Sequence, residues 1–599
     1  MTQRLPFSPS LAAFLLLAVL FAPVFWMVGT KTLMWSMSLV IYAKVGLAGL
    51  LLSLILLMGA VLAERRLGPS RLELIAEISF ARISPWVIAV VAIAVTAIGV
   101  DLVYLGTAIS ADEQMTRFQG EIFAQGGLVG TIPEELRPYS GAVAFGFTRQ
   151  DPTSGAIAST YRPGMAALYA LFAPLGLGAY ASTLLLGASV FLAAAVARQI
   201  WPDRRDAAVL AALLVATSSQ ALAAALTSYA MSAHLAFNLL WLWLFLHNRN
   251  WSHGLAALVG IATAALHQVH VHAFFALPFL LSLLHPFRLR LCLWYGATYA
   301  IGHLGILAWD PVGWAAASVA DGAAGTGAAV ATGAAAGAGG GASVLGLIQG
   351  LLVKIGSLLR PGSWVESATL YANLVRLLAW QNLALVPLLV AFAVYGRWSR
   401  ITVLLAASLV VSFLPYPLLM PDQGHGWGYR YMHGLIGNLA LLATAGWVAL
   451  SQAPEPEIRR LRAAIVLLLL VTPLPLVAQK AIGIHGFAAT FQRSMDEITA
   501  MPADIVVIDD LEVNYGMDLM QNAPDFTNRP LRMRLSRLTA EQIRTLCADH
   551  SLARLGMGPL VPFGGLEATA LRERDPGYRA ADAALRACVG QTGGAAEPG

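Results

Sequence analysis

The stretch from Pro85 to Gln114 reads PWVIAVVAIAVTAIGVDLVYLGTAISADEQ and joins two kinds of sequence. It is apolar from Trp86 to Thr107, apart from Asp101, and about 20 apolar residues in a helix cross the hydrocarbon core of a bilayer. Its end, Ser110 to Gln114, is polar and carries two adjacent carboxylates. We therefore interpret the stretch as a membrane span that opens into an acidic loop at the membrane surface.

The composition of the whole chain is that of a membrane protein. Of its 599 residues, 58% are hydrophobic and only 12% are charged, whereas soluble domains carry roughly 25% charged residues. Apolar windows recur along the chain, and each can cross a bilayer only as a helix, because no water is present there to satisfy the backbone. The sequence predicts an all-α polytopic membrane protein with about thirteen transmembrane helices, near residues 11–29, 39–63, 86–107, 178–198, 206–224, 229–247, 253–267, 270–285, 291–308, 378–396, 401–418, 433–451 and 462–480.

Short arginine clusters between the apolar segments account for the net charge of +5. They are Arg65, Arg66, Arg71 and Arg82; Arg198, Arg204 and Arg205; Arg249; Arg288 and Arg290; Arg397 and Arg400; and Arg459, Arg460 and Arg462. Such clusters mark cytoplasmic loops, and counting spans alternately places all six on one side. We therefore expect a multi-pass protein of the bacterial inner or plasma membrane, with the N-terminus cytoplasmic, the C-terminus outside and no nucleic-acid partner.

This topology divides the chain into three parts. Residues 1–85 hold two N-terminal spans and a cytoplasmic loop. Residues 86–480 form a transmembrane module with outer loops 109–162 and 309–377, and residues 481–599 form an extracytoplasmic domain. Function is expected in the outer parts.

The second outer loop contains a Gly/Ala tract from Ala315 to Ala342. Two interpretations stay open for it. One is a flexible low-complexity segment, and the other is a mobile lid over a substrate.

The C-terminal part of the chain is richer in charge and predicts a small α/β domain. The run Ile505 to Ile508 is strand-like, and a helical stretch from Thr539 to Leu555 follows it. Cys547 and Cys588 lie in this part, and outside the cytoplasm we expect them to form a disulfide; two free thiols are the alternative. We expect no catalytic residue here, but a surface that shapes the acceptor site or docks a partner.

Asp112 and Glu113 end the first outward-running span of the module, and Tyr161, Arg162 and a proline close the loop that follows. This arrangement resembles the GT-C superfamily of membrane glycosyltransferases, in particular protein O-mannosyltransferases and lipid A aminoarabinose transferases. In those relatives an acidic pair ends the span, and a Tyr-Pro-Pro-like segment follows a large outer loop. Arg162 stands where those relatives often have proline. The resemblance covers about residues 86–480 and implies a GT-C-like fold.

The resemblance also implies a chemistry. Transfer of a sugar from a lipid phosphate needs a general base for the acceptor hydroxyl and a cation for the leaving phosphate. Asp112 would be the catalytic base, and Glu113 would be a supporting contact for the acceptor or a substitute for the base. Arg162 would be a second candidate for binding the phosphate, unless it is an exposed loop residue. The donor would be a polyprenyl-phosphate-linked sugar and the acceptor a cell-envelope glycan, lipid or protein, with inversion at the anomeric carbon. No cofactor is required, although some relatives use a divalent cation such as Mg or Mn.

The densest cluster of donor-binding candidates lies between Asp422 and His433. Three glycines within five residues let the backbone approach a ligand. Arg430 offers a guanidinium fork to phosphate oxygens, while Trp427 and Tyr429 offer ring faces to a sugar and His425 lies beside them. The competing interpretation is an interfacial aromatic belt with one snorkelling arginine.

His267, His270 and His272 lie at the turn between two short spans. Neutral imidazoles are common metal ligands, so a metal site is one interpretation. We favour the other, in which His267 and His270, together with Tyr161, line the substrate cavity or bind the acceptor, and we assign no metal ligands.

Two other functions compete with glycosyl transfer as explanations of the sequence. A transporter or flippase for a lipid-linked or anionic substrate would use intramembrane charges and the histidines as its pathway, but no internal repeat is evident. A haem or metal oxidoreductase would use the histidines as ligands, and the absorbance of the purified protein would reveal a haem. We favour the glycosyltransferase, with the transporter as the alternative.

Overall fold

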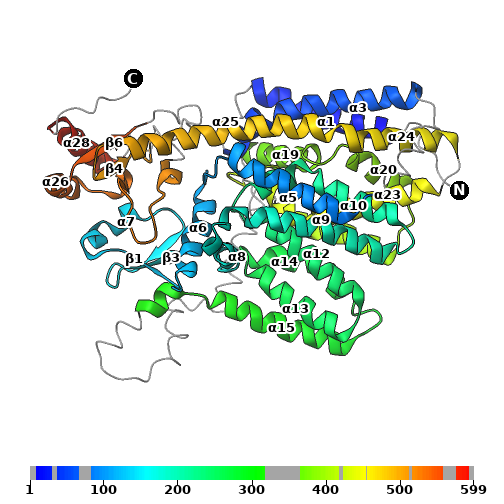
Figure 1. The fold of residues 1–599 in the computed structure, drawn as a ribbon, viewed down its shortest axis with the longest axis horizontal. Helices are drawn as coiled ribbons and strands as arrows, with labels where there is room; N and C mark the ends of the chain where they lie inside the picture. The colour runs from blue at the N-terminus through cyan, green and yellow to red at the C-terminus, as the bar shows by residue number, and fades with distance from the viewer. Residues whose placement is uncertain are drawn as a thin grey trace. The chain divides into compact units, whose positions relative to one another are not determined.

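The computed structural model describes residues 9–29, 37–66, 82–316, 364–416, 423–452, 455–511, 516–556 and 575–591. The chain forms two compact units (Figure 1). The first comprises Met1–Val103, Tyr180–Leu304 and Gly362–Ile484, and the second comprises Tyr104–Ala179, Gly305–Pro361 and His485–Gly599. The second unit therefore collects the first predicted outer loop, much of the second one and the C-terminal part of the chain. Residues 317–342 of the Gly/Ala tract lie outside the described ranges.

The first unit is built from helices, because apolar segments without water must pair their backbone groups internally. The central helix, α23, packs against α10, α20 and α21, and the largest fully buried side chains include Trp241, Trp380 and Trp447. The helices of this unit are α1 (Pro9–Gly29), α2 (Met37–Ile41), η2 (Tyr42–Gly46), α3 (Leu47–Arg66), α5 (Pro85–Leu102), α9 (Ala181–Ile200), α10 (Arg205–Ala216), α11 (Ser219–Ala225), α12 (Met231–His247), α13 (Asn250–Ala264), α14 (Val269–Leu281), most of α15 (Leu289–Leu307), α19 (Trp364–Ala379), α20 (Leu385–Tyr395), α21 (Arg400–Phe413), η6 (Arg430–Leu435), α23 (Ile436–Ser451), α24 (Pro456–Val471) and the start of α25 (Pro473–Ala500).

Several of these helices have the length and apolar character of membrane spans. In the described ranges there are five such helices, or six if the pair α10 and α11, bent by 58°, counts as one span. The five are Ser38–Leu62, Pro85–Leu102, Gly178–Ile200, Arg430–Ser451 and Glu457–Ala500. The predicted mostly helical class with apolar spans is confirmed, whereas the predicted number of about thirteen spans stays a prediction. The predicted domain boundary at residue 480 falls inside α25.

The first predicted outer loop has its own folded core in the second unit. Its strands form a three-stranded antiparallel sheet in the order β1-β3-β2, with Gly130 opposite Ile157 and Arg149 opposite Ala158. All four residues of β3 are buried, so this strand is the centre of the loop. The elements are α6 (Ala111–Ala124), β1 (Gly130–Thr131), η3 (Glu134–Tyr139), α7 (Ser140–Val143), β2 (Thr148–Gln150), β3 (Ala156–Ser159), α8 (Gly164–Phe172), η4 (Ala173–Leu175) and η5 (Gly178–Tyr180), the last of which reaches the unit boundary.

The C-terminal part contains a three-stranded parallel sheet in the order β5-β4-β6. The central strand β4 is buried along its whole length, which explains its unbroken apolar sequence IVVI. The predicted strand over Ile505 to Ile508 is confirmed. The elements are β4 (Ile505–Ile508), η7 (Gly516–Leu519), β5 (Leu531–Arg534), η8 (Leu535–Arg537), α26 (Ala540–Asp549), β6 (Leu552–Leu555) and α28 (Pro576–Gln591).

The predicted helix from Thr539 to Leu555 is wrong at its C-terminal end. Thr539 is the N-cap, and its side chain accepts a hydrogen bond from the backbone N–H of Gln542. The helix ends at Asp549, and Leu552–Leu555 instead forms β6. Both leucines of β6 are buried beside β4, so tertiary packing outweighs the helical preference of this short sequence.

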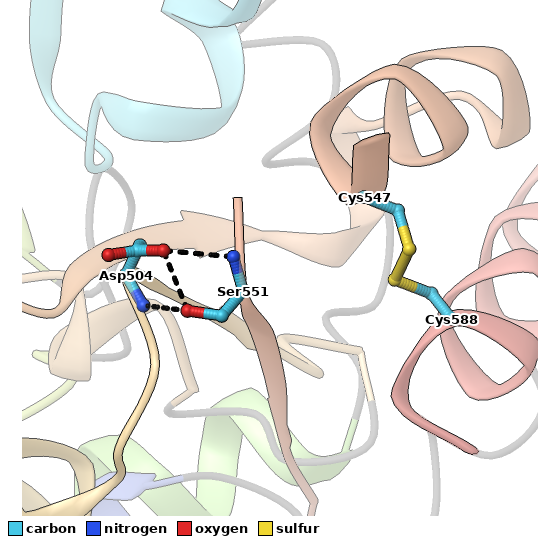
Figure 2. Close-up of a disulfide and its surroundings, with 4 residues drawn as sticks. All are labelled: Asp504, Cys547, Ser551 and Cys588. Carbon is cyan, nitrogen blue, oxygen red and sulfur yellow. Dashed lines mark hydrogen bonds between the residues drawn. A yellow bond between two sulfur atoms is a disulfide. The ribbon is translucent and has the colours of Figure 1, made fainter. Parts of the chain in front are cut away.

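Cys547 in α26 and Cys588 in α28 form a disulfide (Figure 2). The predicted pairing is confirmed. The bond joins two helices 41 residues apart in the sequence, and α28 also packs on β6.

A hydrogen-bonded pair near the disulfide makes the stability of the C-terminal sheet depend on pH. The Asp504 carboxylate accepts hydrogen bonds from the Ser551 hydroxyl at 2.6 Å and from its backbone N–H at 2.9 Å (Figure 2). These bonds hold the pKa of Asp504 below its ordinary value, the hydroxyl contributing most. A carboxyl whose pKa is lower in the folded state contributes stability above its unfolded pKa, and that contribution disappears as the pH falls through the folded pKa.

We expect Ser551→Ala to lower the melting temperature of the protein at pH 7, because the variant lacks the hydroxyl donor. The difference from wild type should shrink below about pH 4, where the carboxylate becomes protonated. Thermal unfolding of both proteins between pH 3 and pH 8 checks this. A difference of the same size across the whole range would show that the hydroxyl does not act through the Asp504 carboxylate.

Candidate active site

Asp112 lies on the first turn of α6, at the start of the first predicted outer loop. The N-cap is Ser110, whose hydroxyl accepts a hydrogen bond from the backbone N–H of Glu113 at 3.4 Å. Acidic side chains in a first helical turn are stabilised by the partial positive charge of the helix N-terminus. The half-buried Asp112 carboxylate therefore occupies a position that favours its negative charge.

Tyr161 donates a hydrogen bond from its hydroxyl to Oδ1 of Asp112. The Tyr161 ring stacks on Phe147, with the ring centroids 5.5 Å apart. The structure thus brings together two of the residues predicted from the sequence, although 49 positions separate them. The contact fixes the orientation of the carboxylate from the far end of the loop.

Glu113 faces inward and is fully buried. Its two oxygen atoms accept hydrogen bonds from the Tyr104 hydroxyl at 2.6 Å and from the backbone N–H of Ile109 at 3.2 Å. Both partners lie in the connection between α5 and α6. The Glu113 carboxylate therefore binds the connection between α5 and α6 and fixes it to the first turn of α6.

The connection between α5 and α6 is a tight turn. Leu105 and Gly106 have φ values of +58° and +62°, a conformation that costs energy for a residue with a side chain such as leucine. Arg117 spans the turn and donates to the carbonyl oxygens of Gly106 at 2.8 Å and Thr107 at 3.2 Å. Sequence reasoning missed Arg117, because an arginine in a polar helix has no local pattern that shows its partner.

Arg162 directly follows Tyr161, the residue predicted to line the cavity, and its side chain has a backbone partner. Its Nη1 donates to the carbonyl oxygen of Ile306 at 2.7 Å. Burial lowers the pKa of its guanidinium from the ordinary value. The side chain is half-buried, which distinguishes it from a fully exposed loop arginine.

The glycine-rich cluster lies in the first unit, and Asp422 at its start is outside the described residues. Gly424, Gly426 and Gly428 have φ values of +62°, +135° and +68°. A Cβ atom on Gly428 would lie 2.5 Å from Oε1 of Gln220, so both conformation and space require glycine there.

Two buried glutamines hold this turn. Gln220 accepts from the backbone N–H of Tyr429 at 3.2 Å and donates to its carbonyl oxygen at 2.8 Å. Gln423 accepts from the backbone N–H of Arg430 at 2.9 Å and donates to the carbonyl oxygen of Gly428 at 2.7 Å. No pattern in the sequence points to Gln220, which lies 209 positions from Tyr429.

The side chains of the cluster differ in exposure. Arg430 is half-buried, and its guanidinium lies over the rings of Tyr229 and Tyr431, 5.7 and 5.4 Å from their centroids. Trp427 and Tyr429 are buried, and Trp427 stacks on Trp380. Arg430 is therefore the residue of the cluster whose positive charge can contact a ligand. The two aromatic rings instead pack inside the first unit. His425 beside them is half-buried.

The histidines near the turn between α13 and α14 lie in different environments. His272 is fully buried and bonded to the Asn238 side chain at 2.9 Å and to the Tyr299 hydroxyl at 3.1 Å. His267 and His270 are half-buried, and the His270 ring lies 6.2 Å from that of Tyr416. Within the described ranges, no group of three or more His, Cys, Asp or Glu side chains is placed to hold a metal ion.

The predicted site residues thus belong to two groups. Asp112, Glu113, Tyr161 and Arg162 lie in the second unit, where Asp112 and Tyr161 are in contact. The donor-binding candidates and the histidines lie in the first unit: His267, His270, His425, Trp427, Tyr429 and Arg430.

Comparison with known proteins gives similarity only to solved structures. No protein-family model and no curated protein sequence matches the chain. The chain is similar to the crystal structure of ArnT from Cupriavidus metallidurans in the apo state, with 13% sequence identity and a TM-score of 0.44, over 73% of this chain and 84% of that chain. It is also similar to the structure of ArnT bound to undecaprenyl phosphate, with 14% identity and a TM-score of 0.43 over the same shares of the two chains.

Proposed function

We propose that the protein is an inverting glycosyltransferase that moves a sugar from a polyprenyl-phosphate donor to an acceptor hydroxyl outside the cytoplasm. The observation that carries the proposal is the position of Asp112. Its carboxylate lies on the first turn of α6, shortly after the apolar helix α5, and is oriented by Tyr161. A carboxylate held in this way can act as a general base toward a substrate at the membrane surface.

In the proposed reaction, the acceptor oxygen attacks the anomeric carbon of the sugar from the face opposite the phosphate. The new C–O bond forms as the bond between the anomeric carbon and the phosphate oxygen breaks, and the polyprenyl phosphate leaves with the electron pair. The acceptor proton moves to the carboxylate of Asp112. The phosphate is a good leaving group, so a second acid is not needed.

Arg430 is the proposed cation for the donor phosphate. A guanidinium presents two parallel N–H groups to phosphate oxygens, which a single ammonium cannot do. The rings of Tyr229 and Tyr431 hold the Arg430 side chain through cation–π contacts. Arg162 has a weaker case, because one of its donors is bonded to a backbone carbonyl.

The direct test is turnover by the purified protein in lipid nanodiscs with a set of polyprenyl-phosphate sugars. Release of polyprenyl phosphate that requires an acceptor supports the proposal. If no donor is cleaved, the same protein in sealed vesicles tests the alternative, because a flippase would move the lipid-linked sugar across the bilayer intact. Intact translocation without cleavage would overturn the transferase proposal.

We expect turnover to persist without divalent cations. In the proposed mechanism the Asp112 carboxylate takes the acceptor proton and the Arg430 guanidinium binds the phosphate, so no step requires a metal ion. Turnover measured in excess EDTA and after addition of Mg²⁺ or Mn²⁺ checks this. Loss of turnover in EDTA, with recovery on adding either ion, would show that a cation takes part.

A further inference from the structure

The C-terminal part of the chain contacts the helix that carries Asp112. Asp518 lies in η7, and its Oδ1 accepts a hydrogen bond from the backbone N–H of Ala111 at 2.6 Å. Ala111 is the first residue of α6 and directly precedes Asp112. The two bonded residues are 407 positions apart, and they are only 6% and 4% exposed.

Two neighbouring side chains of the same segment also bind the outer loop. Gln521 donates to the carbonyl oxygen of Ala108 at 2.7 Å, and Asn522 donates to that of Val143 at 3.0 Å. Ala108 and Ala111 flank the N-cap Ser110. The segment 516–522 therefore bonds to the backbone on both sides of Ser110, the N-cap of α6.

The segment 516–522 is itself fixed to the C-terminal sheet. Asn522 accepts from the backbone N–H of Arg532 at 3.0 Å and donates to its carbonyl oxygen at 2.9 Å. The Arg532 side chain donates in turn to the carbonyl oxygen of Gln521 at 2.8 Å. Arg532 belongs to β5, so the position of Asp518 is tied to a strand of the parallel sheet.

The first N–H groups of a helix have no partner within the helix. In α6, the Ser110 hydroxyl bonds the N–H of Glu113, and the Asp518 carboxylate bonds the N–H of Ala111. The second bond is charge-assisted, and such bonds are stronger than neutral ones. The helical turn that carries Asp112 is thus held by the neighbouring Ser110 side chain and by the Asp518 side chain from the C-terminal part of the chain.

We propose that Asp518 is a positioning residue for Asp112, and that the segment 516–522 is a structural part of the loop that carries Asp112. The inference rests on the proposed function, because it takes Asp112 as the base. The hydrogen bond to Ala111 sets the direction of the first turn of α6. Without it the carboxylate of Asp112 loses its alignment with the acceptor hydroxyl, and a displacement of about 1 Å can cost a hundredfold in rate.

The test compares Asp518→Ala, Asp518→Asn and the control Asp525→Ala in the full chain in nanodiscs. The amide of asparagine still accepts a hydrogen bond from Ala111, whereas alanine cannot. Asp525 is exposed in the same part of the chain, and its carboxylate accepts from Thr527 nearby. We expect Asp518→Ala to lower kcat by about a hundredfold with little change in the donor KM, and Asp518→Asn and the control to stay near wild type.

Two results would overturn the inference: a kcat of Asp518→Ala close to that of wild type, or a loss in Asp518→Asn as large as in Asp518→Ala. If Asp518→Ala does not fold, judged by its melting temperature and by formation of the Cys547–Cys588 disulfide, Gln521→Ala replaces it. That variant removes the separate bond to Ala108 and should also lower kcat; an unchanged kcat would overturn the inference.

The two proposals fail in different ways. No donor-dependent turnover by wild type would overturn the proposed function. Normal turnover by wild type, abolished in Asp112→Asn but unchanged in Asp518→Ala, would overturn only the positioning role.

Discussion

Asp112→Asn is expected to lower kcat by about a thousandfold, because a general base contributes typically 10²- to 10⁴-fold to the rate. Asparagine keeps the volume of the side chain, and its amide oxygen can still accept the hydrogen bond from Tyr161, but it cannot take a proton from the acceptor. The donor KM should change little, since the base acts in the transition state. The measurement is release of polyprenyl phosphate from a lipid-linked sugar donor in nanodiscs.

The chain offers a matched control for this variant. Asp101 in α5 also accepts hydrogen bonds from a tyrosine hydroxyl, that of Tyr180, at 2.9 and 3.0 Å. Asp101→Asn makes the same chemical change at a second Asp–Tyr pair, and its turnover should equal that of wild type. Wild-type turnover in Asp112→Asn would exclude Asp112 as the base. Equal losses in both variants would show a general effect of removing a carboxylate.

Arg430→Ala is expected to weaken donor binding by about ten- to a hundredfold, the range that corresponds to losing hydrogen bonds to a charged group. Arg430→Lys should give an intermediate affinity, because lysine keeps the charge but lacks the planar fork. Titration of a polyprenyl-phosphate sugar into nanodiscs containing each protein measures the dissociation constant.

Arg198→Ala is the control for the loss of one positive charge from the first unit. Arg198 is exposed at the end of α9 and belongs to one of the predicted cytoplasmic clusters. Its replacement should leave donor affinity unchanged. An unchanged affinity in Arg430→Ala as well would exclude Arg430 from the phosphate site.

Features with a local signal could be predicted from the sequence. The run Ile505 to Ile508 is apolar at every position, as expected for a buried parallel strand, and it forms β4. The disulfide followed from the expected compartment of Cys547 and Cys588. Asp112 and Tyr161 were both predicted as site residues from the family resemblance. The structure shows that their side chains are in contact.

Features that depend on distant partners could not be predicted. Asp518 contacts a residue 407 positions away, and Gln220 one that is 209 positions away, and neither stands out among its neighbours in the sequence. The C-terminal end of α26 is determined by the pairing of Leu552 with Ile505 of β4, which places Leu552–Leu555 in a strand instead of the helix. The exposure of Trp427 and Tyr429 depended on packing: their ring faces looked suited to a sugar, but both side chains are buried.

The contact between Ala111 and Asp518 has a consequence for the order of biosynthesis. A ribosome adds about 5–20 residues per second, so the first turn of α6 is made roughly 20–80 s before the carboxylate that holds it, given their separation of 407 residues. During that interval the outer loop lacks the bond that fixes Asp112. If Asp112 is the catalytic base, full activity is reached only after the segment 516–522 has been made and has folded, and a chain that stops before this segment is expected to be inactive.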